Sequence, residues 1–179
     1  VGLRVEHPQE LINAAQYGAK HPANLPPAPY KVTARSQNGR GVYSFCMCPG
    51  GYVVNAGSEP GRLATNGMSY NKRDSGNANS AVIVSVTPQD YGQEGPLAGI
   101  AFQRRLEEAA FLAGKGEIPV QRYGSFCGTG ACGFIPENFL PCIKGKWRFA
   151  DVASLLPKEL YLSFVEGMGQ FGKIIPGFD

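Results

Sequence analysis

The stretch at residues 38–69, NGRGVYSFCMCPGGYVVNAGSEPGRLATNGMS, decides the fold. It contains three short apolar runs, at 42–47, 52–56 and 62–65, and residues rich in Gly, Pro and Asn follow each run. Runs of this length with such borders are typical of β-strands joined by tight turns. We therefore expect a three-stranded antiparallel meander, whose first turn follows a Cys-x-Cys pair.

Hydrophobic periodicity outside this stretch predicts both strands and helices. Alternating apolar residues predict a strand at 1–6, and a β-branched run predicts another at 81–87. Apolar residues spaced by three and four predict two long helices, at 96–113 and 157–171. The fold class expected is α+β, a mostly antiparallel sheet with two main helices packed on it. Shorter expected elements are a helix at 8–16, strands at 30–34 and 118–126, a helix at 149–155, a polar surface loop at 70–80 and an irregular segment at 127–146.

Composition limits the classes of function. The 179 residues, of which 43% are hydrophobic and 17% charged, suit one globular domain. The net charge is only +3 and the basic residues are dispersed, which disfavours nucleic-acid binding. No apolar run reaches the length of a membrane span. The five cysteines include no C-x-x-C pair, which disfavours a structural metal site and indicates reduced thiols in a cytoplasmic protein.

Four segments of the sequence resemble one protein family. They are VGLRVEHPQ at 1–9, the long stretch at 38–86, GPLAGIAFQRRLEEAAFLAG at 95–114 and PVQRYGSF at 119–126. In this order they are similar to the middle region of bacterial FAD-dependent dehydrogenases. These are the NAD(FAD)-utilising dehydrogenases, which fall among the glutathione-reductase-like flavoproteins.

The resemblance implies a part of an enzyme. Residues 1–179 would form a single domain inserted in the FAD-binding domain of a longer flavoprotein, with a mainly β part at 1–95 and a mainly helical and loop part at 96–179. It would be the substrate-binding or cap domain of an oxidoreductase, covering the flavin and inactive on its own. The expected cofactors are FAD, mostly bound outside this chain, and NAD(P)H. The expected partners are the flanking FAD-binding domain and a small-molecule substrate.

The Cys-x-Cys turn is the first candidate site. Residues i and i+2 of a strand point the same way, so Cys46 and Cys48 are expected to face one cavity. After Pro49, the residues Gly50 and Gly51 permit close approach of a flat ligand. We therefore expect the turn to contact flavin or substrate, with both thiols as catalytic candidates. The alternative is a hairpin with two buried, inert cysteines.

Polar residues elsewhere complete the candidate set. Asn66, Met68 and Ser69 form an amide-rich edge suited to hydrogen bonding a flavin ring, although such residues equally suit turns. At the end of the first expected strand, Arg4 is a candidate for binding a substrate anion and His7 for proton transfer. The alternative for His7 is a hydrogen bond to its own loop. The last substrate-binding candidates are Arg40 and Gln121. The alternative for Arg40 is a side chain that is simply solvated.

One literal motif is not assigned a function. Residues 128–133 match G-x-G-x-x-G, but two prolines follow within nine residues and no helical period does. A dinucleotide site requires a helix at that place, so we expect a glycine loop only. Two readings remain beside the cap domain: a stand-alone, non-catalytic module that binds a ligand or a protein, and a thiol oxidoreductase using Cys46 and Cys48.

Overall fold

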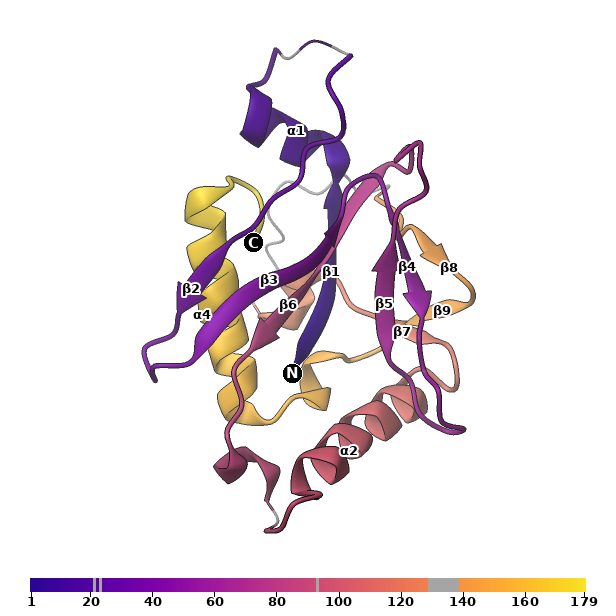
Figure 1. Cartoon of the computed structure of the whole chain (residues 1–179), viewed down its shortest axis with the longest axis vertical. Coiled ribbons are helices and arrows are strands. Elements are labelled where there is room, and N and C mark those ends of the chain that lie inside the picture. The colour runs from indigo at the N-terminus through magenta and orange to yellow at the C-terminus, as the bar shows by residue number, and fades with distance from the viewer. Residues whose placement is uncertain (21, 23, 93, 129–138) are drawn as a thin grey trace.

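The main sheet of the computed structural model has four antiparallel strands (Figure 1). The structure describes residues 1–20, 22, 24–92, 94–128 and 139–179. The strand order is β1-β6-β3-β2, so the first strand of the chain forms one edge. The bounds of these strands are β1 Gly2–Pro8, β2 Thr33–Arg35, β3 Gly41–Cys48 and β6 Asn77–Val84. The predicted strands at 1–6 and 81–87 are therefore the edge strand β1 and its neighbour β6.

Two smaller sheets complete the β structure. One has the order β5-β4-β8, with β4 at Tyr52–Asn55, β5 at Thr65–Met68 and β8 at Ile143–Lys144. The other pairs β7, Ile118–Val120, in parallel with β9, Trp147–Phe149. Because β8 pairs with β4, the parts of the chain before and after residue 95 share one sheet.

The predicted meander is wrong in one respect. β4 and β5 do pair as an antiparallel hairpin, but β3 pairs with β2 and β6 and belongs to the other sheet. A β-bulge between Phe45 and Cys48 bends the end of β3, and Cys46 there adopts a left-handed φ of 46°. The turn at Gly50 and Gly51 then carries the chain into the second sheet.

Glycine is required in this turn by the chain itself. Gly50 has a φ of 48°, and a Cβ there would overlap the carbonyl oxygen of Arg73. A Cβ at Gly51 would come 2.6 Å from the carbonyl oxygen of Met68. These glycines therefore allow neighbouring backbone, and not a ligand, to approach the turn closely.

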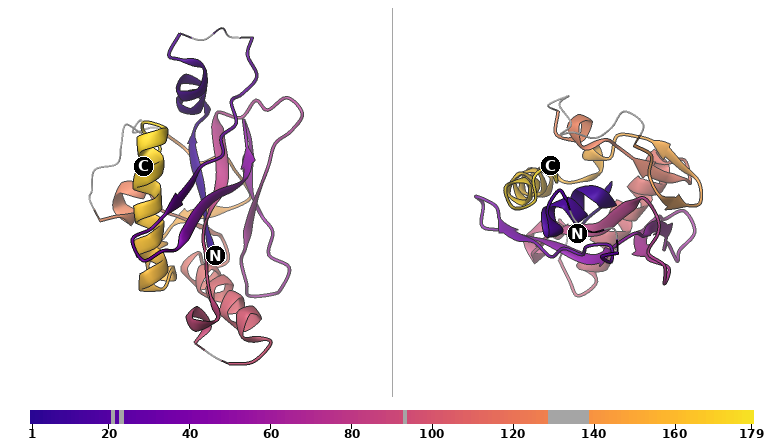
Figure 2. Two further views of the ribbon diagram at one scale, coloured as in Figure 1. Left: turned by 60° about the vertical axis from the view of Figure 1, so that its left-hand side comes forward. Right: turned by 90° about the horizontal axis from the view of Figure 1, so that it is seen from above.

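Helix α4, Lys158–Ile174, lies along one face of the main sheet, whereas the second sheet lies toward the opposite side (Figure 2). The other long helix, α2 at Ala98–Ala113, crosses the lower end of the molecule and contacts β7 (Figure 1). The remaining helical elements are α1 Gln9–Tyr17, α3 Tyr123–Phe126 and the 3-10 turns η1 Pro88–Tyr91 and η2 Ala153–Leu155. The α+β class is confirmed.

The core lies between the main sheet and α4. Val42 and Val82 face the buried side chains Phe164, Met168 and Phe171 of the helix. Gly167 brings the two layers together, because a Cβ on it would overlap the side chain of Val42. A glycine that lowers helix propensity thus permits a close helix–sheet contact.

Several predicted boundaries differ from the structure. The third strand of the quoted stretch lies at Thr65–Met68 instead of 62–65, and the expected loop at 70–80 already contains the start of β6 at Asn77. The expected strand at 118–126 ends at Val120 and is followed by α3. The expected helix at 149–155 is the end of β9 and the turn η2. Within 127–146 the structure contains β8, and residues 129–138 lie outside the described ranges, as does most of the glycine motif.

Candidate functional site

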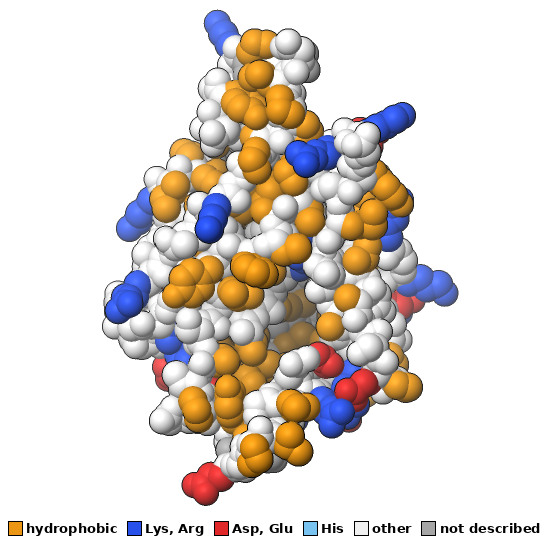
Figure 3. All heavy atoms as spheres, viewed as in Figure 1, with side chains coloured by type: hydrophobic (Ala, Val, Ile, Leu, Met, Phe, Trp, Pro, Cys, Tyr) orange, Lys and Arg blue, Asp and Glu red, His pale blue; other side chains and the backbone are white. Residues whose placement is uncertain are grey.

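A cavity of about 780 Å³ lies beside β1. Its walls come from β1, α2, α4, β7 and the turn η2, and the chain's first and last residues, Val1 and Asp179, both line it. In the space-filling view, a hollow with apolar side chains at its floor opens above α2 (Figure 3). The volume falls within the range of sites that hold a small organic molecule. Many apolar lining residues contribute to the core as well, among them Leu3, Phe102, Leu106, Phe126 and Phe164.

The outer edge of β1 runs along this cavity. Val1 exchanges both backbone hydrogen bonds with Val84 of β6. Along a strand of an antiparallel pair, the backbone N–H and C=O groups of successive residues point alternately toward and away from the partner strand. The backbone groups of Gly2, Arg4 and Glu6 therefore point away from β6. None of the described residues forms a hydrogen bond with these backbone groups. The cavity wall therefore offers a row of backbone donors and acceptors.

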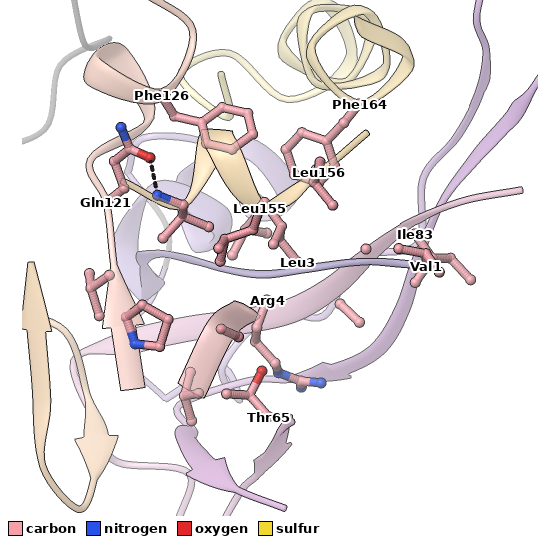
Figure 4. A pocket seen from close by; sticks show the side chains of 18 of the residues that line it. Val1, Leu3, Arg4, Thr65, Ile83, Gln121, Phe126, Leu155, Leu156 and Phe164 are labelled. Carbon is pink, nitrogen blue, oxygen red and sulfur yellow. Dashed lines mark hydrogen bonds between the residues drawn. The ribbon is translucent and has the colours of Figure 1, made fainter. Parts of the chain in front are cut away.

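Arg4 is the cation at this wall. Its Nε donates to Asn79 Oδ1 at 2.7 Å, and its Nη2 donates to the carbonyl of Cys46 at 2.6 Å and contacts Cys48 Sγ at 3.2 Å. Nη1 has only a 3.5 Å contact, with Asn66 Oδ1. All of these partners are neutral groups. Beside Arg4 the close-up shows Thr65, whose hydroxyl group has no hydrogen-bond partner among the described residues (Figure 4).

The two candidate thiols lie behind Arg4, outside the cavity lining. Cys46 is exposed on the bulge, whereas Cys48 is only 7% exposed. Burial raises the pKa of the Cys48 thiol, and the positive charge of Arg4 offsets this in part. A raised thiol pKa disfavours the thiolate on which redox and nucleophilic chemistry depends. The structure thus gives no support to a thiol oxidoreductase that uses Cys48 as its nucleophile.

The other residues predicted to contact the cofactor gather around the same turn. Ser69 Oγ donates to the carbonyl of Pro49 at 2.7 Å, and Met68 lies against Gly51. Pro49 and both turn glycines are buried. Asn66 is exposed next to Cys46 and Arg4. The turn therefore supports Arg4 from behind, and none of Pro49, Gly50, Gly51, Asn66, Met68 and Ser69 lines the cavity.

His7 lines the cavity but is engaged in the core. Only 4% of it is exposed, its Nε2 donates to the carbonyl of Phe178 at 2.8 Å, and its ring stacks on that of Phe178. Burial lowers the pKa of His7 to about 4, against a smaller raising effect of the hydrogen bond. The imidazole is thus neutral near pH 7, and its Nδ1 has no partner among the described residues.

The last two candidates have clear structural partners. Gln121 lines the cavity, and its Oε1 accepts hydrogen bonds from the backbone of Val152 and Ala153. Arg40 does not line it: it forms a two-point ion pair with Asp90 at 2.6 and 2.8 Å, which holds the pKa of Asp90 below its usual value. The structure therefore brings Arg4, His7 and Gln121 to one cavity and places Arg40 elsewhere.

Two residues of this region were not among the predicted site residues. The side chain of Gln9, buried in α1, accepts a hydrogen bond from the backbone N–H of Gly50 at 2.7 Å and fixes the turn. Glu6 accepts hydrogen bonds from the backbone N–H of Cys142 and from Asn77, and burial raises its pKa. The described residues contain no group of three or more His, Cys, Asp or Glu able to hold a metal ion. None of the described helices combines the length and the apolar character needed to cross a membrane.

Comparison with known proteins assigns the family. Residues 1–179 match the family described as "FAD-dependent protein, C-terminal domain-like". The chain belongs to this family. It is also 45% identical, over 182 aligned residues and 99% of its length, to an uncharacterised protein of Clostridium beijerinckii, of which it spans about a third (34%). The resemblance to an FAD-dependent protein is thus confirmed, whereas the position as a middle domain and the dehydrogenase activity stay predictions.

Part of an FAD molecule fits the residues present. The cavity is large enough for a flavin ring, and Arg4 supplies a charge beside it. The pyrophosphate of a dinucleotide requires a strand, a glycine-rich turn and a helix N-terminus in sequence. Neither α1 nor α4 follows a strand through such a turn: α1 follows β1 directly through Pro8, and a proline also precedes the first residue of α4. The 3-10 turn η1 separates α2 from the strand before it, β6. The described residues therefore suit the ring and offer no dinucleotide cradle.

Proposed function

We propose that this chain is the substrate-binding cap domain of an FAD-dependent oxidoreductase. The observation that carries the proposal is the apolar cavity at the free edge of β1, in a chain whose family is FAD-dependent. The flavin, when bound, supplies hydride and electron transfer. The residues of this chain would cover it, exclude water and orient the substrate against it. NAD(P)H is the proposed electron carrier, and the bacterial cytoplasm the proposed location.

The proposed partner is the FAD-binding domain of the same polypeptide. The chain spans only a third of its Clostridium beijerinckii relative, so most of that protein lies outside the matching region. The outer edge of β1, which pairs with no other described strand, also offers hydrogen bonds to an approaching segment or ring. On this proposal the isolated domain neither binds FAD tightly nor turns over substrate.

A flavin titration tests the first part of this proposal. FAD is added to the isolated chain, and the decrease in its fluorescence is followed. We expect no binding at micromolar concentrations, because the described residues lack a cradle for the pyrophosphate. Micromolar or tighter binding would contradict the cap assignment and favour a stand-alone ligand-binding module, for which the cavity is equally suitable.

A matched pair of tryptophan substitutions in the complete flavoprotein tests the second part. Leu106 and Leu112 lie on the same helix, but only Leu106 lines the cavity, whereas Leu112 is 67% exposed. An indole in contact with an isoalloxazine quenches its fluorescence by electron transfer. We therefore expect Leu106→Trp to quench the bound flavin and Leu112→Trp to leave its emission unchanged. Equal emission from the two variants would separate the cavity from the flavin and refute the proposal.

A further inference from the structure

We propose that the cavity binds a small monocarboxylic acid with an apolar body, and that Arg4 and Thr65 hold its carboxylate. This proposal rests on the proposed function and names its class of substrate. It is carried by three features of the cavity: a guanidinium group with no ion pair among the described residues, a neighbouring hydroxyl group with no hydrogen-bond partner among them, and apolar walls.

The guanidinium group of Arg4 has spare capacity for an anion. Its contacts with Asn79, Cys46 and Cys48 fix its Nε and Nη2 and neutralise none of its charge. None of the ion pairs among the described residues includes Arg4. The neutral acceptors behind it thus hold the group rigidly, while Nη1 retains a donor for a ligand. A positioned arginine of this kind suits planar carboxylate recognition.

The surroundings of Arg4 supply a second donor. Thr65 begins β5 and its side chain lies next to that of Arg4 in the cavity (Figure 4). Gly67, two residues further along β5, lets the strand pass directly over Arg4, since a Cβ there would overlap Arg4 Nη2. Two donors on adjacent elements can therefore approach the two oxygens of one carboxylate.

The rest of the cavity defines the body of the ligand. Leu3, Ile83, Phe102 and Leu106 are among the lining residues and offer apolar contacts only. Burial of apolar ligand surface against such walls is favourable, about 25 cal/mol per Å². A volume of about 780 Å³ accommodates a two-ring or three-ring molecule with room to spare.

The charge of the site favours a carboxylate over a phosphate. Three carboxylates also line the cavity: Glu6, Glu107 and Asp179. Glu6 is engaged by Asn77 and the backbone of Cys142, and Glu107 accepts a hydrogen bond from Gln103. Two arginines, Arg4 and Arg122, also line the cavity. A dianionic phosphate would add two negative charges to the three carboxylates, whereas a monocarboxylate adds only one.

Calorimetric titration of the chain with 2-naphthoate and with its neutral isostere 2-naphthamide at pH 7.5 tests this proposal. We expect the acid to bind at least about tenfold more tightly than the amide, as a charge-assisted hydrogen bond predicts. Arg4→Gln should bring the two dissociation constants to within about twofold of each other. Arg40→Gln, the matched control at an arginine outside the cavity, should keep the full preference.

A second variant, Thr65→Val, tests the proposal even if Arg4→Gln does not fold. Thr65→Val preserves the shape of the side chain in β5 and should reduce the preference for the acid about threefold, as the loss of a neutral hydrogen bond predicts. Equal affinity for acid and amide, absence of binding by both, or an unchanged preference in Arg4→Gln would overturn the proposal. If Arg4→Gln does not fold, an unchanged preference in Thr65→Val overturns it.

The proposal and the proposed function fail separately. An acid preference that depends on Arg4, combined with no tryptophan quenching of flavin in the complete protein, would retain the carboxylate site and refute the cap role. Quenching of the flavin by Leu106→Trp, combined with equal binding of acid and amide, would retain the cap role and refute the carboxylate site. Lumiflavin is a neutral flavin ring, and its ability to displace 2-naphthoate should not depend on Arg4. If Arg4→Gln abolishes this displacement, the flavin ring and not a carboxylate is the ligand of Arg4.

Discussion

Arg4 Nε lies 2.7 Å from Oδ1 of Asn79, a side chain that is fully buried near the start of β6. Both residues project from the same face of the main sheet, as diagonal neighbours on adjacent strands. The amide nitrogen of Asn79 has no hydrogen-bond partner among the described residues. A neutral amide therefore holds the guanidinium group where a carboxylate would neutralise it.

The first prediction concerns the neutral amide side chain of Asn79. Asn79→Asp changes the charge with almost no change in shape, and it gives Arg4 a buried anionic partner. We expect the affinity for 2-naphthoate to fall at least about tenfold, because the new aspartate would neutralise the charge of Arg4, and the affinity for 2-naphthamide to change little. Asn66→Asp, at an exposed position 3.5 Å from Arg4, should have a smaller effect because solvent screens it. Equal effects of the two variants would contradict this account.

The second prediction concerns the two glycines inside α4. Gly167→Ala places a methyl group against Val42, so we expect it to destabilise the fold by about 1–3 kcal/mol. Gly169→Ala meets no atom within 4 Å, and the higher helix propensity of alanine should stabilise it by about 1 kcal/mol. Urea unfolding followed by circular dichroism measures both. Opposite signs for two neighbouring glycines are the expected result; the same sign for both would be inconsistent with the close contact.

The third prediction is a loss of stability in mild acid. His7 has a pKa of about 4 in the folded chain and about 6.5 when exposed. The unfolded state therefore binds the proton first, and the free energy of unfolding should fall as the pH decreases from 6.5 to 4, by about 3 kcal/mol in all. Above pH 6.5 this contribution is fully present. Urea unfolding at intervals between pH 4 and pH 7.5 measures the slope.

His7→Phe is the control for this slope. It keeps a ring against Phe178 but leaves the Phe178 carbonyl without its donor, which should cost about 1–2 kcal/mol at pH 7.5. The variant should lose the decrease below pH 6.5. Glu6 has a raised pKa when folded and contributes with the opposite sign, so it cannot produce the predicted loss. A slope that persists in His7→Phe would assign it to another group.

The fourth prediction concerns the thiols. Cys46 is exposed, whereas Cys48 is buried and its pKa is raised by burial. We expect iodoacetamide at pH 8 to label Cys46 at least about tenfold faster than Cys48. Peptide mapping by mass spectrometry distinguishes the sites, and Cys46→Ser should abolish the fast labelling. Faster labelling of Cys48 would reinstate it as a reactive thiol.

Local sequence patterns predicted most of the elements but only part of their pairing. The strands β1 and β6 and the helices α2 and α4 follow from periodicity, because each buries one face. Whether two consecutive strands pair depends on the path between them. The bulge at Cys46 and the positive φ of Gly50 direct the chain after β3 into the other sheet, so β3 does not pair with β4. A segment rich in Pro and Gly is compatible both with this path and with a hairpin.

Buried polar residues account for the remaining differences. Asn77, Asn79 and Ser80 make the start of β6 look like a surface loop, yet each has a specific partner, such as Glu6 for Asn77 and Tyr30 for Ser80. The site shows the same limitation. Arg4 was predicted from its type and position, whereas Thr65 and Gln9 act through contacts with residues far away in the chain, which no local pattern reveals.

The position of Val1 and Asp179 beside the cavity has a practical consequence for work with this domain. An affinity tag or fluorescent label joined to either end would start at the cavity wall. A long tag could occupy the cavity and mimic a ligand, so binding experiments call for cleaved protein. A small environment-sensitive dye attached there would instead report directly on whatever enters.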